Sequence, residues 1–239
     1  SKKGNLEPQA WISEASKKLS HRGPDSSGEW LSEDHKVVFA HQRLAIIDLV
    51  RSSDQPMVSS DETMAIVFNG EIYNYKELRK ELSSLGYKFR TNSDTEVILN
   101  CYKNWGASCV SYFNGMFAFA IYDSLEQKLF IARDRAGEKP FFYYNYKGQF
   151  YFASELKSLF LIPNLEKSLN YVALDKYLKM GYIPGDQCII EGFNKLPPAH
   201  YAHFDLKNGK FEQFQYWNIP DFESNNVMVE QEILSELEE

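Results

Sequence analysis

Residues 114–123 read NGMFAFAIYD, and the run from Met116 to Tyr122 is apolar almost without a break. Such a run is typical of a strand that is covered on both faces. Further strand-like segments follow at hairpin spacing, at residues 129–132, 140–144 and 149–153. Helical segments come before it. Helices followed by a run of antiparallel strands predict a layered α+β domain with helices packed on sheets.

Two capped helices are expected upstream of this strand. Asn74 and Glu77 have the spacing of a capping box before one apolar helix face. Ser93 and Glu96 form a cleaner box before a second apolar face. A shorter helix over residues 11–20 leads into the segment HRGPD at 21–25, where Gly and Pro end it.

The composition favours a globular intracellular protein. Of 239 residues, 44% are hydrophobic, and the formal net charge is −7, which argues against a broad polyanion-binding face. No apolar run approaches the roughly 20 residues needed to cross a bilayer. An odd count of three cysteines without metal-ligand spacing suits reduced thiols, so we expect a cytoplasmic location. We expect no metal site and find no nucleotide-binding motif.

Asn69 and Gly70 directly follow an apolar strand. The Gly70 N–H and the Asn69 side-chain amide are two donors that could form an oxyanion hole. The alternative is an ordinary turn, because Asn-Gly is a common turn dipeptide. On the dipeptide alone, the turn is favoured by roughly four to one.

Charged residues offer a second set of candidates. Arg43 lies in an otherwise apolar stretch, where it could clamp a carboxylate or pair with Asp48 or another acid. Asp94 occupies the first turn of a capped helix, where the helix dipole alone would favour a carboxylate. Glu71 could be a solvated loop charge. Together, Arg43 and Asp94 would match the two charged ends of a free α-amino acid.

The charged segment ARDRAGEKP at 132–140 is interpreted as a solvated hairpin turn. After about residue 160 the sequence becomes rich in Gly and Pro, and residues 201–204 and 211–216 are expected to pair as a final hairpin. The last residues place Val229, Ile233, Leu234 and Leu237 on one helical face. We interpret this end as the start of a further domain that is cut short.

Seven sequence segments together resemble one known family. They occur in order, as HRGPD at 21–25, HQRLAIID at 41–48, FNGEIYNY at 68–75, TNSDTEVIL at 91–99, NGMFAFAIYD at 114–123, ARDRAGEKP at 132–140 and FASELKSL at 152–159. The set closely resembles the glutaminase domain of class II glutamine amidotransferases, which are N-terminal-nucleophile hydrolases with a four-layer αββα fold. The segment GYIPGDQCIIEGFNKLPPAHY at 181–201 resembles the connection found in asparagine synthetases.

The resemblance implies a role for each matching residue. Arg43 would hold the α-carboxylate of glutamine. Asn69 and Gly70 would form the oxyanion hole, and Glu71 and Asp94 would anchor the α-ammonium group. The backbone of Leu44, Ala45, Ile46 and Ile47 would line the same pocket.

The resemblance also implies a glutaminase domain over residues 1–160. Residues 161–239 would then form a connector and the start of a truncated synthetase domain. That C-terminal domain would use ATP and Mg to amidate aspartate with the released ammonia. A homodimer is a family expectation, whereas nucleic acid and membranes are not expected partners.

One departure from the family concerns the nucleophile. The family begins with a processed Met followed by Cys-Gly-Ile in the first strand, whereas this chain opens with Ser1-Lys2-Lys3-Gly4-Asn5. A strand of about six to eight residues is therefore expected to be missing. Because Cys101, Cys109 and Cys188 lie in helical or connector segments, the sequence predicts no cysteine-dependent hydrolysis by the chain as it stands. A second departure, Ala136, is expected to affect only local packing.

Two other functions remain open from the sequence. The chain could belong to an amidotransferase with another acceptor, such as a sugar of a surface polysaccharide. It could also be a non-catalytic glutamine-binding module that keeps the pocket and lacks the nucleophile.

Overall fold

A six-stranded antiparallel sheet forms the centre of the computed structural model, which describes residues 8–45 and 53–220. Its strand order is β11-β10-β6-β5-β4-β3. The bounds are Met57–Val58 for β3, Met64–Ile72 for β4, Gly115–Asp123 for β5, Lys128–Arg133 for β6, His200–Asp205 for β10 and Phe211–Gln215 for β11. The nearly unbroken apolar run predicted a doubly covered strand. This is confirmed, because β5 lies inside the sheet with its core residues buried on both faces.

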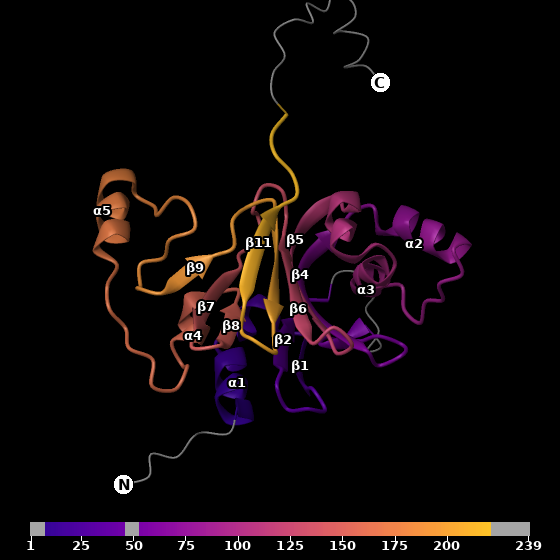
Figure 1. The fold of residues 1–239 in the computed structure, drawn as a ribbon, viewed down its shortest axis with the longest axis horizontal. Helices are drawn as coiled ribbons and strands as arrows, with labels where there is room; N and C mark the ends of the chain where they lie inside the picture. Colours follow the sequence, from indigo (N-terminus) through magenta and orange to yellow (C-terminus); the bar gives the residue numbers. More distant parts are fainter. Residues whose placement is uncertain (1–7, 46–52, 221–239) are drawn as a thin grey trace, which may run out of the picture.

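Two helices cover one face of this sheet, as Figure 1 shows. They are α2 (Tyr75–Ser84) and α3 (Asp94–Trp105), followed by the short 3-10 helix η3 (Gly106–Tyr112). Leu78, Leu82 and Ile98 pack with Ile66 and Phe119 of the sheet in a first hydrophobic cluster. The apolar periodicity of both helices predicted this packing correctly.

The two helix starts differ from their predicted capping boxes. Ser93 does cap α3, because its Oγ accepts a hydrogen bond from Thr95 N at 3.0 Å. The Glu96 carboxylate, however, accepts from the backbone N–H groups of Arg90 and Thr91. The capping box predicted at Asn74 is wrong, because this side chain forms no cap and instead bonds the η3–β5 segment, donating to Tyr112 O and accepting from Asn114 N. Glu96 thus binds the segment just before its helix, whereas Asn74 has long-range partners in place of a local cap.

A second β layer lies on the other face of the six-stranded sheet. It consists of two parts, the hairpin β1–β2 and the sheet β8-β7-β9. Their bounds are Ser26–Leu31 for β1, Val38–Arg43 for β2, Phe142–Tyr146 for β7, Gln149–Ala153 for β8 and Phe193–Lys195 for β9. Phe39, Phe141 and Tyr143 of this layer pack against Val67 and Ala120 of the central sheet in a second hydrophobic cluster.

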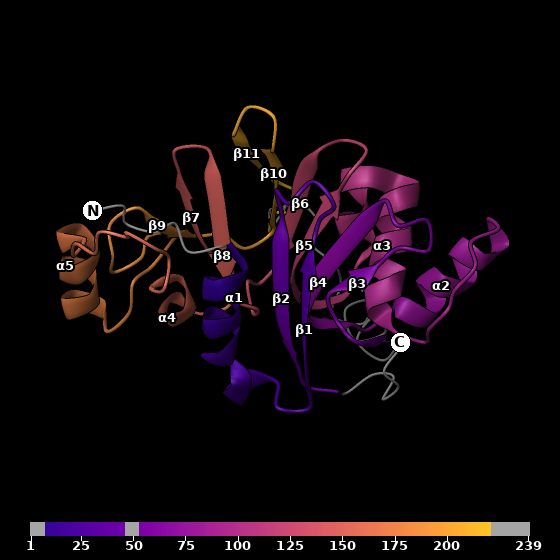
Figure 2. The same ribbon diagram turned by 90° about the horizontal axis from the view of Figure 1, so that it is seen from below.

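Helices α1 (Pro8–Lys17) and α4 (Leu156–Leu159) form the outer layer, and the 3-10 helix η1 (Ser20–Arg22) follows α1. α1 packs on β2 and α4, and α4 packs on β8 (Figure 2). The order helix, sheet, sheet, helix confirms the predicted α+β fold with four αββα layers. Helix α5 (Tyr171–Met180) stands at one end of the molecule, beyond β9 (Figure 1).

Strands from the last third of the described chain complete both sheets. β9 pairs with β7, and β10 pairs with β6 and β11. The predicted final hairpin is thus confirmed as β10–β11. None of the helices in residues 8–45 and 53–220 has the length and apolar character that crossing a bilayer requires.

The segment ARDRAGEKP is not the solvated turn that its charges suggested. Asp134 is only 1% exposed, and its carboxylate accepts hydrogen bonds from three backbone N–H groups, those of Phe117, Glu138 and Lys139, at 2.9–3.1 Å. The Arg133 guanidinium donates to the carbonyl groups of Gly137, Lys139 and Leu196. These two side chains fix the segment, and the bond from Phe117 N to Asp134 ties it to β5.

Replacing Asp134 with Asn should therefore destabilise the protein strongly. The amide would keep one acceptor oxygen but set an NH₂ group against a backbone donor, at a cost of about 2–4 kcal/mol. Asp123→Asn is the matched control, because Asp123 also accepts two backbone N–H bonds but lies half-buried at the end of β5. We expect a loss of less than about 1 kcal/mol there. Urea titration with an unchanged m-value measures both, and equal losses would contradict the role of Asp134.

Candidate functional site

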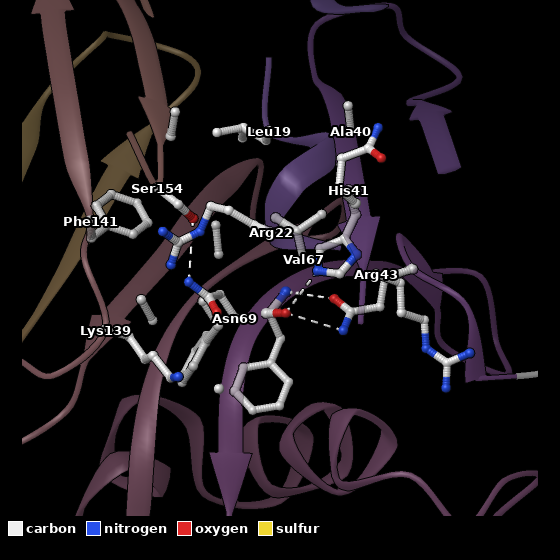
Figure 3. A pocket seen from close by; sticks show the side chains of 18 of the residues that line it. Leu19, Arg22, Ala40, His41, Arg43, Val67, Asn69, Lys139, Phe141 and Ser154 are labelled. Carbon is white, nitrogen blue, oxygen red and sulfur yellow. Dashed lines mark hydrogen bonds between the residues drawn. The ribbon is translucent and has the colours of Figure 1, made fainter. Parts of the chain in front are cut away.

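A cavity of about 520 Å³ lies between the two β layers. Its floor is made by β4 and β5, one wall by the end of β2, the opposite wall by the end of β8, and its cover by α1 and α4. Figure 3 shows the cavity from close by. The side chains fall into a polar group and an apolar group. The polar group includes Arg22, His41, Gln42, Arg43, Ser53, Gln55, Asn69, Glu71, Asp94, Lys139 and Ser154, and the apolar group includes Trp11, Val67, Ala118, Ala120, Phe141 and Phe152.

The second β layer is interrupted at this cavity. Among the described strands, β2 pairs only with β1, and β8 pairs only with β7. Residues 40–43 of β2 and residues 152–154 at the end of β8 both line the cavity. Among the described strands, no third strand pairs with either of these edges, and the floor of the space between them includes the apolar residues Val67, Ala118 and Ala120.

Arg43 lines the cavity and also forms an ion pair. It ends β2, is 8% exposed and lines the cavity. Its Nη1 also donates to Asp54 Oδ1 at 2.8 Å, and Ser26 Oγ donates to the same oxygen at 2.9 Å. The acid that pairs with Arg43 is thus Asp54, while the alternative partner Asp48 lies outside the described residues.

The segment after Arg43 is only partly described. Leu44 lines the cavity and is 54% exposed. Ala45 is not one of the lining residues, and its N–H donates to Asp25 Oδ2 at 2.8 Å. Ile46 and Ile47 lie outside the described residues, so their assignment stays a prediction.

Asn69 and Gly70 lie within β4, so the turn interpretation of this dipeptide is wrong. Both residues line the cavity. Gly70 has φ +148°, and a Cβ built there would lie 2.0 Å from Met116 O. Only glycine allows this close approach of β4 to β5. The Asn69 side chain points toward Ser154, with Nδ2 3.4 Å from Ser154 Oγ (Figure 3).

Asp94 and Glu71 bring two carboxyl groups to the same cavity. Asp94 is 5% exposed at the start of α3, and its Oδ2 accepts a hydrogen bond from Ile72 N at 3.1 Å. Burial raises the pKa of Asp94, and the nearby negative charge of Glu71 raises it further. A helix-dipole role alone does not explain this placement, since the carboxylate also faces a space where it would favour a bound cation.

Five of the predicted site residues therefore converge: Arg43 from β2, Asn69, Gly70 and Glu71 from β4, and Asp94 from α3. One guanidinium group, two potential hydrogen-bond donors and two carboxyl groups thus surround one space. This arrangement suits a zwitterionic amino acid whose side chain ends near Asn69.

Several other lining residues had no expected role. Gln55 and His41 both form hydrogen bonds with the backbone of Phe68. His21 and Arg22 also line the cavity, and both contact Glu155 at 2.9–3.0 Å. Lys157 contacts the same carboxylate at 2.9 Å. Although burial acts to raise it, these hydrogen bonds hold the pKa of Glu155 at about 2. The motif HRGPD contained His21 and Arg22, but no sequence signal indicated their partner.

None of the three cysteines, all of which are described, lines the cavity. Cys101 and Cys109 are buried on the helix-covered face of the central sheet, and Cys188 is buried in the cluster around α4 and β9. Burial raises the pKa of all three thiols, that of Cys188 to about 11. No thiol among the described residues therefore lies in the cavity.

His41 makes a testable contribution to the stability of this site. Burial lowers its pKa to about 4, from an ordinary 6.5. Between pH 6.5 and pH 4, His41 therefore binds a proton in the unfolded chain but not in the folded chain. The contribution of His41 to the free energy of unfolding is complete above pH 6.5 and declines as the pH falls. Between pH 7 and 5 the loss should be about 1–2 kcal/mol.

His41→Gln should reduce the pH dependence of the unfolding free energy by that amount. His35→Asn is a suitable control, because His35 is exposed outside the cavity and its φ of 57° is one that Asn tolerates. Urea titrations at pH 5 and pH 7 measure the difference. An unchanged pH dependence in His41→Gln would show that burial does not shift the pKa of this ring, so that folded and unfolded chains bind its proton over the same pH range.

Comparison with known proteins identifies the family. Residues 2–217 match the family model described as glutamine amidotransferase domain. Asparagine synthetase [glutamine-hydrolyzing] 3 of Bacillus subtilis is 40% identical over 84% of this chain and 32% of its own length. Amidase chry2 of Gibberella zeae is 36% identical over 90% of this chain and 31% of its own length. The chain thus spans about a third of the length of these curated relatives.

The fold agrees with this match. The glutamine phosphoribosylpyrophosphate amidotransferase of B. subtilis superimposes with a TM-score of 0.64 over 90% of this chain and 48% of that structure, at 18% sequence identity. The layers, the cavity and the family match lead to one conclusion: this chain belongs to the glutamine amidotransferase domain family and has the fold of the N-terminal-nucleophile hydrolases.

Proposed function

We propose that this chain is the glutamine-hydrolysing part of a glutamine-dependent asparagine synthetase. The convergence of Arg43, Asn69, Gly70, Glu71 and Asp94 on one cavity is the observation that carries the proposal. Glutamine enters with its α-carboxylate at Arg43 and its α-ammonium at Asp94 and Glu71. Its side-chain amide then extends along β4 to the donors at Asn69 and Gly70.

The nucleophile in this proposal is the cysteine of an additional strand. The unpaired edges of β2 and β8 and the apolar floor of β4 and β5 offer a place for a strand between the two parts of the second layer. A cysteine at the start of that strand attacks the amide carbon, and its own α-amine accepts the thiol proton. The proton then passes to the leaving ammonia, and water releases glutamate from the thioester.

The remaining parts of the proposal concern the whole protein. Residues after about 160 form a connector that contributes strands to both β layers and leads toward the next domain. Ammonia passes to a C-terminal domain that uses ATP and Mg to activate aspartate. The similarity to asparagine synthetase 3 supports this acceptor. We also propose a cytoplasmic location and a homodimer.

A second candidate acceptor is favoured by one of the relatives. Amidase chry2, at 36% identity, is not named as an asparagine synthetase. An amidotransferase for another acceptor, such as a sugar, would use the same glutamine site. Incubating the full-length protein with glutamine, ATP, Mg and aspartate distinguishes the two, because asparagine formation supports the first candidate and glutamate release alone supports the second.

Glutamate release tests the hydrolytic step directly. The chain preceded by a strand that begins with Cys-Gly-Ile should hydrolyse glutamine, whereas the chain starting at Ser1 and a Cys→Ala version of the extended chain should not. The physical reason is that no thiol among the described residues reaches the cavity. Equal rates in all three proteins would remove the nucleophile assignment, and binding without any hydrolysis would favour a non-catalytic module.

Substitutions at the two ends of the pocket should affect different kinetic constants. Arg43→Ala should mainly raise KM, because the carboxylate contact exists in both the bound substrate and the transition state. Asn69→Ala should mainly lower kcat, by on the order of a hundredfold, because an oxyanion donor acts on charge that develops during the reaction. Steady-state kinetics with the cysteine-extended chain measure both, and the opposite pattern would reverse the assigned roles.

A further inference from the structure

The side chain of Gln55, two residues before β3, extends the β3–β4 hydrogen-bond ladder beyond its last backbone pair. β3 pairs Met57 with Ile66 and Val58 with Ala65. Extending this register by two residues sets Gln55 opposite Phe68. There the Gln55 side-chain amide makes both bonds that a strand would make, accepting from Phe68 N at 2.6 Å and donating to Phe68 O at 3.1 Å.

Gly70 occupies the next position on the same edge of β4. Alternate residues of a strand direct their backbone groups to the same edge, so Phe68, Gly70 and Ile72 share it. The side-chain oxygen of Gln55 accepts a hydrogen bond from Phe68 N, and the Asp94 carboxylate accepts one from Ile72 N at 3.1 Å. The Gly70 N–H lies on this edge between the two N–H groups that are bonded to side chains, at the point where β4 lines the cavity.

His41 supports Gln55 from the other side. Its Nε2 lies 3.0 Å from Phe68 O, and since a carbonyl can only accept, Nε2 carries the proton. The Phe68 carbonyl thus receives two hydrogen bonds, one for each of its lone pairs. Nδ1 of the same ring is buried and has no hydrogen-bond partner in the described part of the chain, which suits a neutral imidazole.

Gln55 also connects the two ends of the cavity. Its Nε2 lies 3.4 Å from Thr95 Oγ1, and Thr95 follows Asp94 at the start of α3. Gln55 is buried, at 9% exposed, so its amide is held by these partners and not by solvent. A single amide group therefore touches both the strand that carries Gly70 and the helix that carries Asp94.

We propose that Gln55, supported by His41, is the positioning residue of the oxyanion hole: it ends the ladder one step before Gly70 and aims the Gly70 N–H into the cavity. This inference rests on the proposed glutamine hydrolysis. It assigns Gln55 and His41 no contact with glutamine, so their loss should affect the chemical step more than glutamine binding.

Gln55→Glu is the most informative variant, because it keeps the side-chain shape and the acceptor for Phe68 N. It replaces the donor to Phe68 O with a carboxylate oxygen, so that two acceptors face each other. In the cysteine-extended chain, we expect kcat to fall about 10- to 100-fold, with KM changed less than about threefold. Gln127→Glu is the matched control. Gln127 is also partly buried and donates to a backbone carbonyl, Ser124 O, at 3.0 Å, but it lies outside the cavity. Its kcat should stay within about twofold of the unsubstituted value.

A glutamine analogue with an aldehyde in place of the amide gives an independent readout. Its adduct with the cysteine thiol places an oxygen in the oxyanion hole, whereas the product glutamate uses only the binding groups. Gln55→Glu should weaken the inhibition constant of the aldehyde in proportion to the loss of kcat and leave the inhibition constant of glutamate unchanged. A merely structural role would lower the melting temperature without separating these two constants.

His41 supplies a second test if Gln55→Glu does not fold. His41→Leu removes the donor to Phe68 O and should lower kcat, whereas His41→Gln places an amide donor at the same point and should restore most of it. Unchanged kcat in Gln55→Glu, or equal kcat in His41→Leu and His41→Gln, overturns the inference alone. An extended chain without glutaminase activity overturns the proposed function together with this inference.

Discussion

The pairing of β4 with β5 is the constraint on which the rest of the site depends. The ladder runs through nine consecutive residue pairs, from Met64 opposite Asp123 to Ile72 opposite Gly115. Glycines at two positions allow the backbones to approach, since a Cβ at Gly70 or at Gly115 would lie about 2 Å from the carbonyl oxygen of Met116 or Glu71. Alternation along β4 then sends Asn69 and Glu71 into the space between the sheets. A slip of one residue would turn both side chains toward α2 and α3.

The sequence predicted those elements whose signals are local. The apolar run of β5, the apolar faces of α2 and α3 and the Ser93 cap all depend on neighbouring residues, and the structure has them where they were expected. The failures share one cause. Asn-Gly at 69–70, the cap at Asn74 and the charged segment at 132–140 were each assigned a common local role, but long-range pairing determines all three.

The convergence of the candidate site could be inferred only from the ordered motifs. Arg43 and Asp94 lie at the ends of elements about 50 residues apart in sequence, and no spacing rule brings β2 and α3 together. Gln55 and His41 were missed for a related reason. The role of Gln55 depends on the register of β3 against β4, and that of His41 depends on how β2 packs over β4. Neither arrangement leaves a local sign in the sequence. Residues that contact a ligand form recognisable motifs more readily than residues that hold the backbone behind them.

The positive charge of Arg43 in the cavity has an acidic partner, whereas the two negative charges repel each other, and this difference affects how the cavity would hold an amino acid. Arg43 already has Asp54 as a partner, so its position is fixed before any ligand arrives. Asp94 and Glu71 repel each other, and burial adds to the cost of ionising Asp94. An ammonium group between them would remove that cost. The strand proposed between β2 and β8 would act similarly on the apolar side, because it would cover Val67, Ala118 and Phe152 and pair two open edges at once. A nucleophile carried on that strand would be positioned by the same contacts that complete the second β layer, so that assembling the core and assembling the reactive site become one event.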